Sequence, residues 1–319
     1  MHAVEINAHA KINLFLEVTA RRSDGYHELA TLFARVGLCD RLRLEKTKKS
    51  GIALKLSVAD GARGHRHARG RGPRQAGVTN HSNLEFLKPA DNIVYKAAEK
   101  FFPAFGIAPA VKIILLKRIP VGAGLGGGSS DAAAALLALS RLYGLDNKNS
   151  SKKLSRLALE LGSDVPFFLL NETFALGRGR GEILRPLKGR GRLPVVLLVY
   201  PGEPVYTKEV YGRLKLGVGS EIAAKLKDLK KLTLLIKKGH FNAAAGPLLF
   251  NRLETPVLPN HKKAAGAKKT MLALGADAVL MAGSGAVVFA LVWNRAQAAK
   301  MAARVSKHKG YGVFLSNFW

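Results

Sequence analysis

Hydrophobic and polar residues alternate along the first segment of the chain, from residue 4 to residue 18. The polar positions of this segment are Glu5, Asn7, His9, Lys11, Asn13 and Glu17, and the positions between them are almost all apolar. A period of two is typical of a strand buried on one face, so the pattern predicts a half-buried β-strand. Lys11 and Asn13 would then point to the same side of that strand.

Two further apolar segments enclose a glycine-rich stretch. Residues 111–116 predict a strand, and an Ala- and Leu-rich run that reaches Leu142 predicts a helix. Ser129 or Ser130 would cap the start of this helix, and Gly144 would end it. Between strand and helix, five of the seven residues 122–128 are glycines. Their backbone N–H groups can approach an anion at the positive end of the helix, which predicts a phosphate-binding loop.

The rest of the chain predicts helices that begin near Asp91, as a candidate N-cap, and over residues 154–161. Asp164 comes just before Pro166 and is a further candidate N-cap. Residues 193–200 form a continuous apolar run that predicts a buried strand, and Pro201-Gly202 predicts a turn after it. We place a domain boundary near this strand, which predicts one domain over residues 1–192 and a second over residues 193–319.

Three interpretations of the glycine-rich stretch compete. It could be a flexible linker, but strongly patterned elements flank it. It matches G-x-G-x-x-G at Gly122, Gly124 and Gly127, yet Pro120 precedes the glycines and no acidic strand end follows at the dinucleotide-binding spacing. A Walker loop is excluded because no Gly-Lys-Ser/Thr follows. The run from Pro120 to Ser130 closely resembles the pattern Pro-x-x-x-Gly-Leu-Gly-x-x-Ser-Ser of the GHMP kinase superfamily, and we favour this third interpretation.

Composition narrows the class of protein. The chain has 319 residues, of which 48% are hydrophobic, so it can bury a full core. No apolar run approaches the roughly 20 residues of a membrane span, and no basic segment precedes an apolar one at the N-terminus. The single cysteine, Cys39, permits no internal disulfide and fits a reducing compartment, where we interpret it as a small buried residue. These features predict a cytoplasmic protein without a membrane partner.

The chain is strongly basic, with 51 Lys and Arg against 22 Asp and Glu and a formal charge of +29. Such a field attracts nucleic acid without specificity and also concentrates nucleotides and diphosphates. Most of the charge is scattered, which is typical of solvated surface. Residues 61–74 contain five arginines, no acid and no aromatic residue, so we expect a mobile insertion rather than a specific RNA-binding arm.

A second resemblance lies in the N-terminal segment. Residues 8–16, followed by Arg22-x-Asp24-Gly25-Tyr26-His27-x-Leu29, resemble the opening of the 4-diphosphocytidyl-2-C-methyl-D-erythritol kinases, a family within the GHMP superfamily. Asp24-Gly25 is a turn signal that would present Tyr26 and His27 at a loop edge. The resemblance implies that these two residues recognise cytidine. Two looser matches, Thr207 and Tyr211, would lie on the substrate side, with Tyr211 as the second ring around cytosine.

The resemblance implies an α+β fold. A ribosomal protein S5 domain 2-like N-terminal domain would be followed by a ferredoxin-like C-terminal domain, with the active site in the cleft between them. Residues 282–286 resemble the third GHMP motif, a glycine turn near the phosphates. The nucleotide contacts that the resemblance implies are Asn92, Lys117, Pro120, Gly122, Gly124, Leu125, Gly126, Gly127, Gly128, Ser129 and Ser130.

The activity that the resemblance implies is transfer of the γ-phosphoryl group of ATP, with Mg²⁺, to the 2-hydroxyl of 4-diphosphocytidyl-2-C-methyl-D-erythritol. This is a step of the non-mevalonate route to isoprenoids. Asp164 would accept the hydroxyl proton, Lys11 would orient Asp164 and stabilise developing negative charge, and Asn13 would position the acceptor. No residue is assigned to the metal, and a monomer or weak homodimer is expected. The alternatives are another GHMP kinase, acting on mevalonate or homoserine, and a basic nucleic-acid-binding protein.

Overall fold

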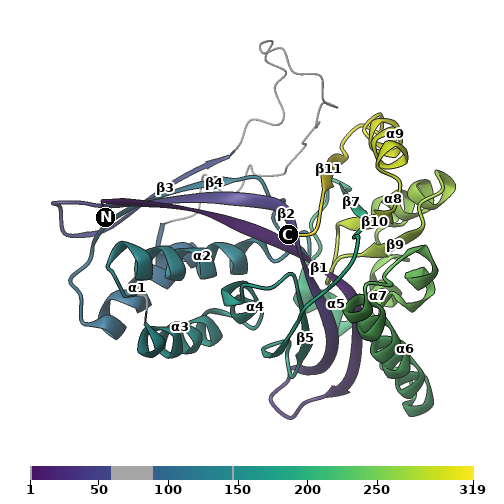
Figure 1. The fold of residues 1–319 in the computed structure, drawn as a ribbon, viewed down its shortest axis with the longest axis horizontal. Helices are drawn as coiled ribbons and strands as arrows, with labels where there is room; N and C mark the ends of the chain where they lie inside the picture. The colour runs from purple at the N-terminus through teal and green to yellow at the C-terminus, as the bar shows by residue number, and fades with distance from the viewer. Residues whose placement is uncertain (1, 59–88, 146) are drawn as a thin grey trace.

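A computed structural model describes residues 2–58, 89–145 and 147–319, which form two β-sheets with helices packed against each (Figure 1). The arginine-rich segment 61–74 lies outside the described residues. The larger sheet has the order β3-β4-β2-β1-β8, and β5 pairs with both β2 and β6. Its strands are β1 (Ala3–Arg21), β2 (His27–Lys46), β3 (Gly51–Val58), β4 (Ala110–Lys117), β5 (Phe174–Arg178), β6 (Ile183–Leu187) and β8 (Phe250–Asn251).

Strand β1 confirms the predicted strand but is buried more fully than its alternation indicated. Every residue from Ala10 to Val18 is buried, on both faces, including Lys11 and Asn13. The half-buried prediction is therefore wrong for this part of the strand. One face of the sheet packs against α1 and α2, whereas apolar residues of β1 such as Ile12 share a second core with strands β7 and β10. Polar side chains here are enclosed because two layers meet over the strand.

The helices on one face of the larger sheet are α1 (Ile93–Phe105), α2 (Gly127–Leu142), α3 (Lys148–Leu161) and α4 (Val165–Leu169), with a short 3₁₀ turn, η1 (Pro89–Asp91), before α1. Asn92 rather than Asp91 caps α1, because its side chain accepts a hydrogen bond from the Val94 N–H. Gly126 precedes α2 without a side-chain cap, so the predicted serine cap is wrong. Gly144 follows α2 with φ +70°, as predicted.

The smaller sheet is antiparallel throughout, with the order β11-β7-β10-β9. Its strands are β7 (Val195–Tyr200), β9 (Ala278–Met281), β10 (Val288–Val292) and β11 (Gly312–Ser316). Helices α8 (Lys262–Ala273) and α9 (Arg295–Val305) pack on one face (Figure 1). The α+β class is thus confirmed. The boundary near residue 193 stays a prediction, since β7 belongs to the smaller sheet whereas β8 returns to pair with β1.

The remaining elements connect the two sheets. They are α5 (Thr207–Gly212), α6 (Gly219–Lys238), the 3₁₀ segment η2 (Ala243–Leu248) and α7 (Glu254–Val257). Arg252, just after β8, donates two hydrogen bonds of 2.8 Å to the buried carboxylate of Glu17 on β1. This paired contact fixes β8 beside β1, where both strands border the site described below. Among the helices of the described part, none is long and apolar enough to cross a membrane.

Candidate active site

A cavity of about 1270 Å³ lies where the glycine-rich loop, the β1–β2 turn, the start of α4 and the α5 region meet. This volume exceeds the roughly 300–1,000 Å³ of an ordinary single-ligand site, so there is room for two ligands side by side. All the predicted site residues except Ser130 line it, and Ser130 lies directly beneath the loop. The fold thus brings residues that are more than a hundred positions apart in the sequence to one cavity.

The glycine-rich loop is held from below by its carbonyl groups. Leu125 accepts a hydrogen bond from the Lys11 N–H at 2.9 Å, and Ala123 accepts one from Val287 at 3.2 Å. Gly122, Gly124 and Gly126 all have positive φ. Within the described residues, the N–H groups of positions 122–126 donate to no partner. The loop therefore presents free amide donors directly before α2, a geometry that suits an anion, and phosphate binding there stays a prediction.

Gly124 is where the loop touches the smaller sheet. A Cβ atom there would lie 2.0 Å from the Ala282 carbonyl oxygen, and the residue has φ +75°. Gly124→Ala is therefore expected to lower the free energy of unfolding by at least about 2 kcal/mol, measured by denaturant titration. Gly128→Ala is the matched control, because its Cβ would meet only Ile93 Cγ2, at 3.7 Å. We expect Gly128→Ala to lower the free energy of unfolding by less than about 1 kcal/mol. Equal losses in both variants would contradict a steric role for Gly124.

Lys11 and Asp164 form the polar centre of the cavity. The Lys11 ammonium lies 3.4 Å from the Asp164 carboxylate and donates a 2.8 Å hydrogen bond to Asn13 Oδ1. The Asn13 amide in turn donates to Thr31 Oγ1 at 2.8 Å. Lys11 is buried, whereas the Asp164 side chain keeps 32% of its surface exposed. A fixed cation thus stands beside a carboxylate that a ligand can reach.

Arg35 on β2 supports the helix that follows Asp164. Its buried guanidinium donates to three backbone carbonyls at 3.2, 3.3 and 2.6 Å, those of Phe167, Phe168 and Leu170. Burial lowers the pKa of Arg35 to about 10, so it remains charged at neutral pH. The Trp319 ring covers the guanidinium at 4.4 Å. Because these carbonyls end α4, Arg35 anchors the segment that carries Asp164 at its start.

Lys117 lies beneath the glycine-rich loop, between two buried carboxylates. Its ammonium contacts Asp40 on β2 and, at 2.6 Å, Asp131 on α2. Burial by itself lowers the Lys117 pKa, but Asp131 and Asp40 outweigh it and raise that pKa above its ordinary value. Burial also raises the pKa of Asp131. Lys117 borders the predicted nucleotide site, yet its charge is already paired, so a direct nucleotide contact stays a prediction.

The β1–β2 turn forms the opposite end of the cavity. Gly25 has φ +83°, and Asp24 accepts a hydrogen bond from the Tyr26 N–H at 3.0 Å, which confirms the predicted turn. The Tyr26 side chain is 53% exposed. The ring of His27 packs on Tyr211 with 5.0 Å between centroids. Burial and the nearby Arg21 lower the pKa of His27, which keeps its imidazole neutral at neutral pH and able both to donate and to accept hydrogen bonds.

Tyr211 and Thr207 come from α5. Tyr211 is half-buried, and burial together with the charge of Asp164 raises the pKa of its phenol. Its ring contact is with His27, so a cytosine held between Tyr26 and Tyr211 stays a prediction. The Thr207 hydroxyl lies 2.9 Å from the Ser284 hydroxyl of the 282–286 turn. That turn therefore joins α5 to the cavity wall.

Comparison with known proteins identifies the family. The GHMP kinases N terminal domain model matches residues 92–172, and the GHMP kinases C terminal model matches residues 223–311. The 4-diphosphocytidyl-2-C-methyl-D-erythritol kinase of Pelotomaculum thermopropionicum is 39% identical over 93% of this chain and 92% of its own. This chain belongs to the 4-diphosphocytidyl-2-C-methyl-D-erythritol kinase family. The enzyme of that name from Macrococcus caseolyticus is 37% identical over 92% of this chain and 91% of its own.

Solved structures agree with this assignment. The crystal structure of a 4-(cytidine 5'-diphospho)-2C-methyl-D-erythritol kinase covers 99% of both chains with a TM-score of 0.73 and 34% identity. A homoserine kinase from Cytophaga hutchinsonii has a TM-score of 0.71 but only 20% identity over 99% of this chain and 96% of its own, which shows the shared fold alone. The two-domain GHMP kinase fold that the sequence motifs implied is confirmed.

The predicted nucleotide contacts outside the glycines differ in whether their side chains reach the cavity. Asn92 lines the cavity, although its side chain caps α1. Pro120 and Ser129 also line it. Ser130 is buried and donates to the His9 carbonyl at 2.7 Å, so its hydroxyl holds α2 to β1 rather than facing the cavity. Their contacts with nucleotide stay predictions.

Sequence reasoning missed four buried residues of the site: Thr31, Arg35, Asp40 and Asp131. Asp131 directly follows Ser130 in the glycine motif, so its place beneath the loop could have been inferred. The other three lie in β2, far from the motifs in sequence, and only tertiary pairing brings them in. Arg180, on the turn between β5 and β6, also lines the cavity.

Proposed function

We propose that this protein phosphorylates the 2-hydroxyl of 4-diphosphocytidyl-2-C-methyl-D-erythritol with ATP, a step of the non-mevalonate isoprenoid route. The observation that carries the proposal is the Lys11–Asp164 pair, placed in one cavity between a free-amide glycine loop and an aromatic turn. A triphosphate donor fits the loop, and a nucleoside-linked acceptor fits the turn. The names of the relatives support this combination, because such a kinase binds both a phosphate donor and a cytidylated acceptor.

In the proposed reaction the acceptor hydroxyl oxygen attacks the γ-phosphorus, and the bond from that phosphorus to the β-phosphate oxygen breaks to release ADP. Asp164 takes the hydroxyl proton. Lys11 holds Asp164 in place and lies close enough to offset negative charge on the transferring group. Asn13, fixed by Lys11 and Thr31, positions the acceptor. The free amides of residues 122–126 hold the phosphates.

Magnesium is part of this proposal as the counter-ion of the triphosphate. Among the described residues, no group of three or more His, Cys, Asp or Glu side chains could hold a metal by itself. Mg²⁺ commonly takes one or two protein ligands and completes its shell with phosphates and water. Asp131 has a buried Oδ1 without a partner and lines the cavity beside Ser129, so these two residues would hold the ion. The bound ion would screen the triphosphate charge.

The proposal is tested by ADP release with Mg²⁺-ATP. We expect turnover that requires the cytidylated acceptor, with none above background for free methylerythritol, homoserine or mevalonate. A reaction without acceptor measures ATP hydrolysis. Equal turnover with the free polyol would contradict a cytidine site, and turnover with homoserine or mevalonate alone would assign the same fold to another acceptor.

A further inference from the structure

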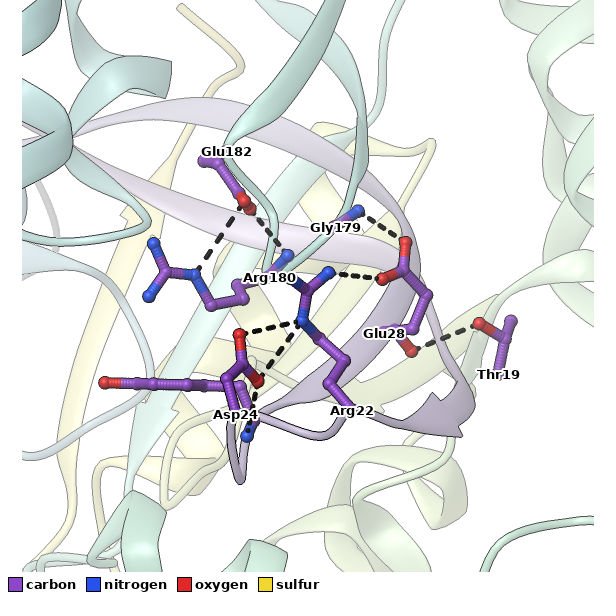
Figure 2. A network of polar contacts seen from close by, with 8 residues as sticks. Thr19, Arg22, Asp24, Glu28, Gly179, Arg180 and Glu182 are labelled. Atoms are coloured by element: carbon purple, nitrogen blue, oxygen red, sulfur yellow. Dashed lines mark hydrogen bonds and ion pairs between the residues drawn. The ribbon is translucent and has the colours of Figure 1, made fainter.

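The turn between β5 and β6, residues 178–182, is bound to the β1–β2 turn by a network of polar contacts (Figure 2). Glu28 accepts a 3.0 Å hydrogen bond from the Gly179 N–H, and the Gly179 carbonyl accepts one of 2.7 Å from Leu29. The other Glu28 oxygen pairs with Arg22 at 2.9 Å, and Arg22 also holds Asp24. The two turns therefore form one unit, which fixes the 178–182 segment relative to Tyr26.

Arg180 extends from this unit into the cavity. Figure 2 shows its side chain running away from the Glu28 contact toward the side where Glu182 lies. Its guanidinium carbon lies 4.8 Å from the centroid of the Tyr26 ring, and its Nε is 3.8 Å from Glu182. The next residue, Gly181, approaches the catalytic end, because a Cβ there would lie 3.8 Å from Asp164 Oδ1. Arg180 thus contacts the aromatic turn, and its chain neighbour Gly181 lies beside Asp164.

Part of the Arg180 guanidinium is available to bind a ligand. Within the described residues, its two terminal nitrogens, Nη1 and Nη2, donate no hydrogen bond; Glu182 contacts the guanidinium only at Nε and accepts its other hydrogen bond from the Arg180 backbone N–H. Two other cavity cations are already paired, Lys11 with Asp164 and Lys117 with Asp40 and Asp131. Arg21 and Lys208 also line the cavity but are exposed and have no ion-pair partner among the described side chains. Arg180 combines free donors with a position fixed by its neighbours.

We propose that Arg180 binds the diphosphate of the nucleotide-linked acceptor; this rests on the function proposed above. Such an acceptor is linear, with the base at one end, the reacting hydroxyl at the other and the diphosphate between them. Tyr26 marks one end and Asp164 the other; Arg180 contacts the first, and the next residue, Gly181, lies beside the second. A guanidinium offers parallel N–H donors that match phosphate oxygens. Its stacking on Tyr26 reduces the ordering cost of binding.

The test compares ligands that differ in their phosphates. CDP and cytidine are titrated calorimetrically into wild type, Arg180→Gln and Arg178→Gln, with the ATP side saturated by a non-hydrolysable analogue. Arg178 is the matched control, because it lies in the same segment, is exposed and does not line the cavity. We expect Arg180→Gln to weaken CDP binding about tenfold or more, the size of a lost charge-assisted contact, and to change cytidine binding less than about twofold. Arg178→Gln is expected to change neither.

The outcomes separate this assignment from the function on which it rests. Unchanged CDP affinity in Arg180→Gln, or an equal loss for CDP and cytidine, would overturn the assignment; the latter would mean that Arg180 only supports Tyr26. A wild-type protein that turns over the cytidylated acceptor while Arg180→Gln keeps its KM for that acceptor would overturn it as well. A wild-type protein that does not bind CDP would overturn the proposed function, and the assignment with it.

Discussion

Replacing Asp164 with asparagine is expected to lower kcat by about 10²–10⁴-fold, the range for a lost general base. Asparagine keeps the size and shape of the side chain, but it cannot take a proton and cannot pair as an anion with Lys11, 3.4 Å away. The measurement is acceptor-dependent ADP release under saturating ATP and acceptor. A variant within threefold of wild type would remove Asp164 from the chemical step.

The Asp164→Asn experiment needs controls for folding and for nucleotide binding. Asp164 makes no capping hydrogen bond to α4, and Arg35 holds the other end of that helix. The substitution should therefore keep α4 in place and lower the unfolding midpoint only modestly, through the anion that buried Lys11 loses. The KM for ATP should also stay within about twofold, because in the proposed complex the free amides of the glycine loop, and not Asp164, hold the triphosphate. A variant that lost ATP binding together with kcat would indicate a collapsed site rather than a missing base.

The parts of the site that the sequence predicted are those with a local signal. The glycine spacing of residues 122–128 predicted a phosphate loop because free amides and positive φ are properties of the loop itself. The alternation in β1 placed Lys11 and Asn13 on one side, and their 2.8 Å hydrogen bond confirms it. Asp24-Gly25 predicted the turn that presents Tyr26. Each of these predictions depended only on neighbouring residues.

The parts that the sequence did not predict depend on packing between distant segments. Alternation in β1 indicated one buried face, but the second sheet covers the other face as well, and nothing within residues 10–18 signals that layer. From the sequence alone Arg35 is an ordinary cationic residue of a strand; only the fold places the three carbonyls at the end of α4 beside it. The serine cap of α2 failed because Ser130 instead bonds to His9, more than a hundred positions away.

The buried trio of Lys117, Asp40 and Asp131 explains how the glycine loop is supported. Asp40 accepts hydrogen bonds from Lys117 and from the backbone N–H groups of Arg118 and Ile119, which begin the approach to the loop. Asp131, the second partner of Lys117, belongs to the start of α2, the helix that follows the loop. Lys117 thus joins β2, β4 and α2 at the base of the glycine loop. We therefore expect Lys117 to contribute mainly to the stability of the fold around the loop.

Lys117→Met is accordingly expected to lower the free energy of unfolding by about 3–5 kcal/mol, the usual cost of removing one partner from a buried ion pair. Methionine fills a similar volume but leaves two carboxylates enclosed without their cation. Asp131 is the worse placed, since Lys117 bonds its Oδ2 and its Oδ1 has no partner. Denaturant unfolding measures the loss. Lys112→Met on the same strand is the matched control, because Lys112 is exposed, and should cost less than about 0.5 kcal/mol. If Lys117→Met costs no more than Lys112→Met, the trio does not support the loop.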